Sequence, residues 1–392
     1  MPNRLIVREG KVVGPDGVSR ADVLAVDGRI EAIEAGMADR WLQDGGEALD
    51  AEGAWVLPGL IDLHCDAIEK EVEPRPNTLF PFGMAFVQYE RKLALHGITT
   101  MFHSLSLGVG LSLRGEHLTE RLIRHIAQSR RERAMIRHRV HLRYEVSHLT
   151  GMPLARRLID EGLIQYLSFM DHAPGIGQYR RPGAFERYVM KNQGVDLHEA
   201  AAIVEELQQR RSRIDWEELR ALAGQARGRG IAIASHDDDS EAMVDRSRSL
   251  EASVVEFPLN LETAQYATRQ GVHVCVGAPN LVRGGSHDNN LSAIDAIRAG
   301  AADIVCSDYH PASLLESVFL LADEGIPLER AVASASHNPA RAMGIAAATG
   351  SLEPGKLADL LVVRKVQGCP VAETTVVGGR VVQTTRDYRS SH

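Results

Sequence analysis

The middle of the chain alternates short apolar runs with longer stretches in which apolar residues return at helical spacing. This alternation is typical of parallel α/β folds, because each helix carries the chain back to start the next strand. Eight parallel strands with intervening helices predict a (β/α)8 TIM-like barrel. The expected strands lie near residues 57–66, 98–106, 138–147, 163–172, 230–237, 252–258, 272–277 and 303–309.

Both ends of the chain have a different pattern. Short β-branched or aliphatic runs, at 5–7, 23–26, 359–363 and 374–377, alternate with turn signals such as Asp27-Gly28. We therefore predict a small β-sandwich domain formed by both termini, residues 1–55 and 346–392. The catalytic barrel is expected to span residues 56–345.

One connection in the barrel is too long for a plain crossover helix. About 60 residues separate the fourth expected strand from the fifth. Helical patterns at 197–208 and 216–227 predict a helical insertion at about 175–228. Two roles remain open for it: an extra packing or dimer helix pair, or a cap that shapes a substrate pocket over the barrel mouth.

Composition narrows the class of protein. With 392 residues, 44% hydrophobic and 5% aromatic, the chain is an ordinary globular protein. A net charge of −8 argues against a general affinity for nucleic acid, and no apolar stretch approaches the length of a membrane span. The first residues show no signal-peptide pattern, so we expect a cytoplasmic protein with no nucleic-acid or membrane partner. The four cysteines are scattered and are expected to be free thiols.

Metal-ligating side chains follow several expected strands. His64 and Asp66 end the first strand, where alternation turns them to the same face and turns Cys65 away. The strands of such a barrel end at one mouth, where the chemistry of the fold takes place. The candidate ligands that could meet there are His64, Asp66, Glu145, His172 and His236.

These residue types indicate metal catalysis. A single histidine or aspartate after a strand is more often a loop residue or a helix cap, but imidazoles and carboxylates together suit a divalent ion. We expect zinc, with manganese and iron as alternatives. Five side chains exceed the four of a closed structural zinc site and fit one or two catalytic ions. Asp308, after the eighth strand, is the candidate catalytic residue that accepts a proton from metal-activated water.

Cationic and hydroxyl side chains follow two of the same strands. Lys70 and Arg75 come after the first strand, and a glycine-rich loop after the seventh carries Arg283, Ser286 and His287. Such groups bind phosphate or carboxylate oxygens, which makes these five residues candidate substrate ligands. An ordinary solvated loop explains each stretch about equally well.

Arginines are concentrated between Arg121 and Arg143. Leu118, Leu122 and Ile126 recur there at helical spacing, so one face of a helix is expected to be buried. The pattern predicts that the arginines of this stretch form a solvated outer face.

The first expected strand also carries a family signature. Pro58-Gly59-Leu60-Ile61-Asp62-Leu63-His64 resembles the first-strand motif of the amidohydrolase superfamily, and residues 336–340 and 350–360 resemble its barrel exit. Asp66 stands where a second histidine is usual, and Glu145 replaces a carboxylated lysine. Together with the segments at 170–175 and 283–287, these departures resemble the phosphonate-metabolism diphosphatases of that superfamily.

The resemblance implies that the barrel is of the metal-dependent hydrolase kind and has a specific activity. It implies hydrolysis of α-D-ribose 1-methylphosphonate 5-triphosphate to the 5-phosphate and pyrophosphate in phosphonate (C–P lyase) catabolism, by a homodimer acting on a phosphorylated ribose. The alternative is an amidohydrolase that cleaves a C–N bond, as a cyclic amidase or deaminase, because the same machinery serves both reactions. The cationic loops favour the phosphorylated substrate. A non-catalytic relative is disfavoured, because the candidate ligands and Asp308 are retained.

Overall fold

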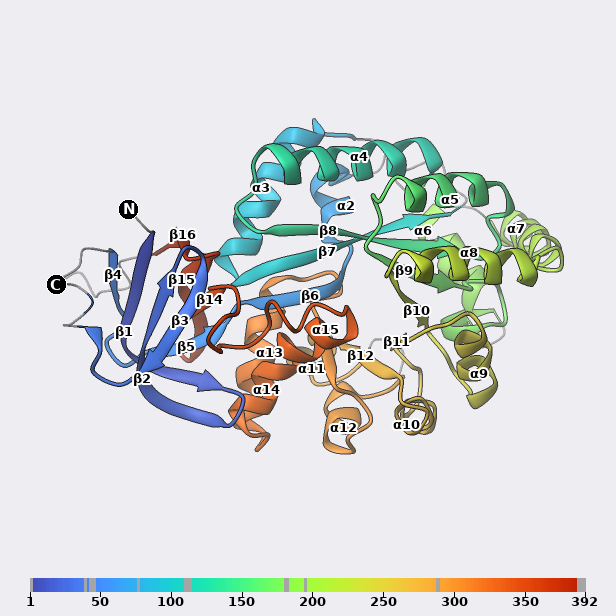
Figure 1. Cartoon of the computed structure of the whole chain (residues 1–392). Coiled ribbons are helices and arrows are strands. Elements are labelled where there is room, and N and C mark those ends of the chain that lie inside the picture. The colour runs from blue at the N-terminus through green and yellow to red at the C-terminus, as the bar shows by residue number, and fades with distance from the viewer. Residues whose placement is uncertain are drawn as a thin grey trace.

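The chain forms an eight-stranded parallel barrel and a second eight-stranded sheet made by its two ends (Figure 1). This computed structural model describes residues 3–38, 41, 47–75, 78–108, 115–179, 183–193, 196–286 and 290–385. The predicted fold class, a hydrolase-type barrel with a small β domain, is confirmed.

Each expected barrel strand is present, and neighbouring strands pair in parallel in chain order. Backbone hydrogen bonds link the first strand to the last: the Asp66 N–H donates to the Asp308 carbonyl, and the Asp308 N–H donates to the His64 carbonyl, both at 2.8 Å. This contact holds the carboxyl ends of the two strands together at the mouth. The strands are β6 (Leu60–Cys65), β7 (Ile98–Leu107), β8 (Arg137–Glu145), β9 (Tyr166–Met170), β10 (Ala232–His236), β11 (Val254–Glu256), β12 (His273–Gly277) and β13 (Ile304–Cys306).

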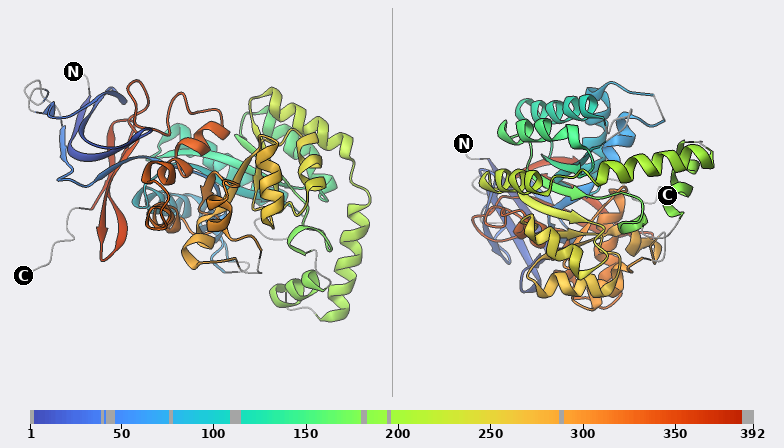
Figure 2. Two further views of the ribbon diagram at one scale, coloured as in Figure 1. Left: turned by 90° about the horizontal axis from the view of Figure 1, so that it is seen from below. Right: turned by 90° about the vertical axis from the view of Figure 1, so that its right-hand side faces the viewer.

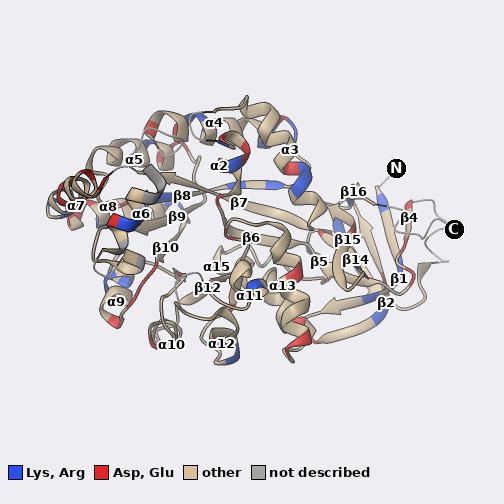
Figure 3. Ribbon diagram, turned by 180° about the vertical axis from the view of Figure 1, so that it is seen from behind, with Lys and Arg blue, Asp and Glu red and all other residues tan. Residues whose placement is uncertain are grey.

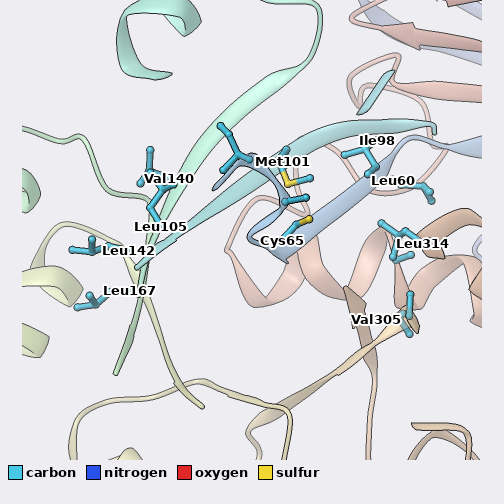
Figure 4. Close-up of a cluster of buried hydrophobic side chains, with 14 of the residues drawn as sticks. Leu60, Cys65, Ile98, Met101, Leu105, Val140, Leu142, Leu167, Val305 and Leu314 are labelled. Atoms are coloured by element: carbon cyan, nitrogen blue, oxygen red, sulfur yellow. The ribbon is translucent and has the colours of Figure 1, made fainter. Parts of the chain in front are cut away.

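Helices surround the barrel and bury its outer face. Outward-facing side chains such as Met101, Leu105, Val140 and Leu142 form the main core with them (Figure 4). No helix in the described ranges is both long enough and apolar enough to cross a bilayer. The surrounding helices are α2 (Ala67–Val72), α3 (Phe82–Leu95), α4 (Glu116–Glu132), α5 (Met152–Asp160), α8 (Trp216–Gly228), α9 (Glu241–Ser249), α10 (Leu261–Arg269), α11 (Ala278–Arg283), α12 (Ala293–Arg298), α13 (Ala312–Asp323), α14 (Leu328–Ser334) and α15 (His337–Ala342).

The small β domain unites the two ends of the chain. Its strands run in the order β16-β15-β14-β5-β1-β2-β3, with β4 paired to β1, and the buried residues Val23, Val56 and Leu360 contribute to its core. The strands are β1 (Arg4–Gly14), β2 (Gly17–Val26), β3 (Arg29–Glu34), β4 (Glu47–Asp50), β5 (Trp55–Pro58), β14 (Leu360–Val366), β15 (Cys369–Val377) and β16 (Arg380–Thr384).

The apolar run at 56–63 serves both sheets, because Gly59 divides it. Val56 pairs with Val362 in the small domain, whereas Leu60 pairs with Ile98 in the barrel. A Cβ at Gly59 would lie 2.3 Å from the Thr99 Oγ1, so the close approach of the two backbones requires glycine here. The domain connection therefore leads directly into the strand that carries His64.

The long connection after β9 holds two further helices, α6 (Ala184–Gln193) and α7 (Leu197–Arg211). They project from the barrel on the side far from the small β domain (Figure 2). A capping box between Asp196 and Glu199 starts α7, and Phe185, Val189 and Ala200 form a separate apolar cluster. In contrast, α8 packs on α5 and β10 as part of the barrel's outer layer.

Candidate metal centre and active site

The mouth of the barrel contains unusual backbone. Asp237, Phe257 and Asp308 follow β10, β11 and β13 with φ values of 59°, 53° and 59°. The N–H groups of Asp237 and Asp308 still bond to carbonyls of neighbouring strands, at 3.0 and 2.8 Å. The left-handed conformation therefore begins where the strand ladder ends. Non-glycine residues adopt it rarely, and such residues concentrate at functional sites.

His172, His236 and Asp237 form one group of potential metal ligands, with one ligand atom of each within 4.8 Å of the others. The Asp237 Oδ2 lies 3.2 Å from the His236 Nδ1 and 3.9 Å from the His172 Nε2. Burial by itself would raise the pKa of Asp237, but its interactions with His236 and then with His172 lower it overall. This carboxylate is therefore stabilised in its charged form.

His64 belongs to a second buried group with Glu256 and His141. The Glu256 Oε2 lies 3.0 Å from the His64 Nδ1 and 4.0 Å from the His141 Nε2, and the Tyr166 hydroxyl donates to the Glu256 Oε1 at 3.0 Å. Burial lowers the pKa of His64 and of His141 well below the usual range. The His64 and His236 rings lie 5.5 Å apart, so the two groups adjoin.

Asp66 and Glu145 lie at the edge of these groups. The Glu145 Oε2 is 2.9 Å from the His172 Nδ1, and the Asp66 Oδ2 is 3.7 Å from the Arg143 Nη1. The structure therefore brings all five predicted ligands to the same end of the barrel. Cys65 points the other way, as alternation predicts, and its Sγ lies 3.4 Å from the Tyr89 hydroxyl on α3.

A cavity of about 300 Å³ opens beside these residues. Burial, followed by repulsion from Asp66, raises the pKa of Asp308 to about 7. A carboxyl group with such a pKa can exchange a proton near neutral pH. The charged and polar side chains in the lining are Asp66, Arg143, His236, Asp237, Asn280, Arg283, Ser286, Asn290, Asp308 and Tyr309.

Comparisons with known proteins identify the family. Residues 190–382 match the family described as Amidohydrolase family. The chain is 34% identical over 325 residues to the alpha-D-ribose 1-methylphosphonate 5-triphosphate diphosphatase of Escherichia coli (strain K12), which covers 81% of this chain and 85% of that protein. The chain belongs to the amidohydrolase family. The expected family resemblance, including its diphosphatase branch, is thereby confirmed.

Other amidohydrolase relatives are more distant. The L-hydantoinase of Paenarthrobacter aurescens is 32% identical over 97 residues, which cover 25% of this chain and 19% of that protein. The structure of a Xaa-Pro dipeptidase superimposes with a TM-score of 0.66 at 14% identity, over 97% of this chain and 99% of that one. This structural likeness shows the shared fold.

The residues of this amidohydrolase fit the divalent metal on which the family depends. The His236 Nδ1 and the Asp237 Oδ2 are buried and lie 3.2 Å apart, and neither atom forms a hydrogen bond within the described part of the chain. Buried polar atoms are normally satisfied, and imidazole nitrogen and carboxylate oxygen are typical ligands of zinc and related ions. The assignment of individual residues as metal ligands stays a prediction.

The predicted substrate ligands separate into three cases. Arg283 and Ser286 line the cavity. Lys70 and Arg75 are exposed and are not part of its lining, so their role stays a prediction. His287 lies outside the described residues.

Between 175 and 228, no described residue lines the cavity, so the described parts of α6 and α7 do not form its wall. Their role in packing or dimer contacts stays a prediction.

The expectation of a solvated outer face is wrong for Arg137, Arg139 and Arg143, which lie on the inner face of β8, and most clearly for Arg143. This side chain is buried inside the barrel, and its Nη2 lies 3.2 Å from the His236 Nε2. The prediction from helical spacing applies only to α4, where Leu122 and Ile126 are buried as expected. From Arg137 the chain is a strand, so alternation decides which arginines face inward.

Sequence reasoning missed four residues of the site: Arg143, His141, Asp237 and Glu256. Two signals were available. Glu256 is a lone carboxylate ending a short apolar strand, and such a strand is buried on both faces. His141 and Arg143 stand four and two residues before Glu145, respectively, on the same face of one strand.

Proposed function

We propose that this amidohydrolase is a metal-dependent diphosphatase that hydrolyses α-D-ribose 1-methylphosphonate 5-triphosphate to the 5-phosphate and pyrophosphate in phosphonate catabolism. The observation that carries the proposal is the composition of the mouth cavity. It places Arg143 and Arg283 beside Asp308 and the candidate ligands, and guanidinium groups are suited to phosphate oxygens. Similarity to the E. coli diphosphatase over 81% of the chain supports the same substrate.

The candidate ligands in this proposal are His64, Asp66, Glu145, His172 and His236, and Asp237 joins them because its ligand atom lies within the same group. These side chains would hold a divalent ion, in this proposal zinc, which would supply activated water and neutralise charge on the phosphoryl oxygens. Glu256 orients the His64 ring through their 3.0 Å contact.

The remaining side chains bind the substrate and move a proton. Asp308, with its pKa near 7, accepts the proton of the attacking water on a carboxylate oxygen. Arg283 and Ser286 bind oxygens of the β- and γ-phosphates. Water oxygen adds to the phosphorus nearest the ribose, the P–O bond to the β-phosphate breaks, and pyrophosphate leaves.

We also propose that the enzyme is a homodimer. Light scattering after size-exclusion chromatography measures its molar mass and so tests this proposal.

The decisive experiment is a pyrophosphate-release assay. Chelated protein is reconstituted separately with Zn²⁺, Mn²⁺ or Fe²⁺ and given the ribose triphosphate. We expect turnover with at least one ion, and a raised KM in an Arg283→Gln variant. Arg330→Gln, on an exposed side chain outside the cavity lining, is the matched control and should retain wild-type kinetics.

Two results would contradict the proposal. Hydrolysis of cyclic amides such as hydantoins, with no turnover of the triphosphate, would show a C–N hydrolase. Absence of both activities, together with no metal bound after reconstitution, would show a binding module that retains the barrel.

A further inference from the structure

A second cavity lies at the end of the barrel opposite the mouth. It has a volume of about 710 Å³ and lies between the end of α4, the start of β8 and the turn that joins β15 to β16. Basic residues are spaced along β8 in Figure 3. We call this cavity the arginine groove, because six arginines line it: Arg130, Arg131, Arg133, Arg137, Arg139 and Arg380.

The positive charge of the arginine groove is largely uncompensated, although the whole chain carries a net charge of −8. Glu132 is the one carboxylate among its described lining residues, and it accepts a hydrogen bond from the Gln128 Nε2 at 2.7 Å. The Arg137 Nη1 lies 2.6 Å from the Asp359 Oδ2. Within the described ranges, none of the other five arginines forms an ion pair with a carboxylate.

Arg139 lies close to two other arginines of the groove, Arg130 and Arg137. Arg139 lies over the Phe102 ring, 5.6 Å from its centroid, and its Nε is buried without a hydrogen-bond partner among the described residues. Burial, followed by repulsion from Arg130 and Arg137, lowers the pKa of Arg139. The groove therefore contains a donor that lacks an acceptor and cations that repel one another.

The backbone around these arginines is also fixed. The buried Glu90 carboxylate accepts hydrogen bonds from the N–H groups of Met135 and Ile136, in the segment that leads into β8. On the facing turn, a Cβ at Gly378 would lie 3.5 Å from the Arg137 Nη2, so this glycine leaves the approach to Arg137 open. A ligand would thus meet the partly buried guanidinium groups of Arg137 and Arg139 on a fixed backbone, beside exposed arginines at the rim.

We propose that the arginine groove binds a small anion that carries two or three linked phosphates. Guanidinium groups pair bidentately with phosphate oxygens. Several neighbouring arginines therefore suit a ligand with linked phosphates better than they suit a ligand with a single carboxylate. This binding site is separate from the mouth and does not depend on the proposed reaction, because no described residue lines both cavities.

Isothermal titration calorimetry with pyrophosphate and inorganic triphosphate tests the proposal on the full-length, metal-free protein. The groove variant Arg130→Gln/Arg380→Gln changes two exposed side chains. The mouth variant is Arg283→Gln, and Arg213→Gln/Arg330→Gln is the matched control on exposed arginines that line neither cavity. Circular dichroism confirms that each variant is folded.

We expect the mouth variant and the control to retain a binding event that the groove variant weakens at least about tenfold, since it removes two charge-assisted hydrogen-bond donors. Arg139→Gln should weaken the same event, and added salt should reduce its affinity. The proposal is overturned if the groove variant binds both anions as the wild type does. It is equally overturned if the Arg283→Gln protein binds neither anion at millimolar concentration.

Discussion

Glu256 orients a candidate metal ligand from inside the barrel, and its replacement tests the architecture of the site. Burial lowers the pKa of His64 well below its usual range, so the neutral ring donates its Nδ1–H to the Glu256 carboxylate at 3.0 Å. The Nε2 is then the nitrogen with a lone pair for a metal. Loss of such an orienting carboxylate typically reduces metal affinity. We predict that Glu256→Gln, which keeps an acceptor but removes the charge, weakens metal binding by about 10–100-fold.

The structure also indicates how much stability the protein should lose when Glu256 is replaced. Glu256 is fully buried and accepts from both His64 and the Tyr166 hydroxyl. Glu256→Ala leaves two buried donors without a partner, at about 1–3 kcal/mol each, so the free energy of unfolding should fall by about 2–6 kcal/mol. Glutamine can accept from His64 through its oxygen and donate to the Tyr166 oxygen, so its cost should be smaller.

Two measurements separate these effects. Competition with a chromogenic chelator gives the metal dissociation constant, and urea unfolding of metal-free protein gives the stability. The matched control is Tyr166→Phe, which removes the other hydrogen bond to the same carboxylate and keeps that of His64. Its metal affinity should remain close to wild type. If Glu256→Gln binds metal as tightly as the wild type, the carboxylate does not orient His64 and the reasoning is wrong.

Three further predictions follow from single contacts. Gly59→Ala should lower the free energy of unfolding by about 1–3 kcal/mol, because the new Cβ would overlap Thr99, and Thr99→Ala in the same chain should recover part of the loss in urea unfolding. Burial by itself would raise the pKa of Glu90, but the hydrogen bonds from His138, Met135 and Ile136 lower it overall. Its contribution to stability is therefore present above the unfolded pKa of about 4.5 and is lost as the pH falls through the lower folded value, so Glu90→Gln should destabilise the protein more at pH 7 than at pH 3.5. Asp308→Asn should lower kcat by about 10²–10⁴-fold while the metal content measured by mass spectrometry stays unchanged; a mutant with wild-type kcat would exclude Asp308 as the proton acceptor.

The sequence pattern predicted the barrel because each strand is an apolar run bounded by turns. Such a run can be recognised without knowing which strands pair with it. It did not predict the division at Gly59. The run at 56–63 is continuously apolar, and nothing in its periodicity shows that one half pairs with Val362 and the other with Ile98. Pairing between distant segments decides that boundary, so it becomes visible only in the folded chain.

The candidate site was predictable to a similar extent. His64, His172 and His236 could be found because a polar ligand after an apolar strand interrupts a simple pattern. Asp237 was harder, because its role depends on a left-handed backbone at φ 59° that turns it toward the mouth. Glu256 contacts His64 across 192 residues of sequence, and no local signal reports such a contact.

Strand β8 explains how so many charged groups fit inside one barrel. Its inner face carries Arg137, Arg139, His141, Arg143 and Glu145 at alternate positions. The arginines and the glutamate lie toward the two ends, where a carboxylate, an imidazole or an open cavity is available to each charge. His141, at the centre, is held neutral because burial lowers its pKa, and serine hydroxyls 3.1 and 2.9 Å away satisfy its two nitrogens. The centre of β8 therefore carries no charge, while both ends of the strand concentrate it. One strand thus supplies cations to the mouth and to the arginine groove without placing an unpaired charge between them.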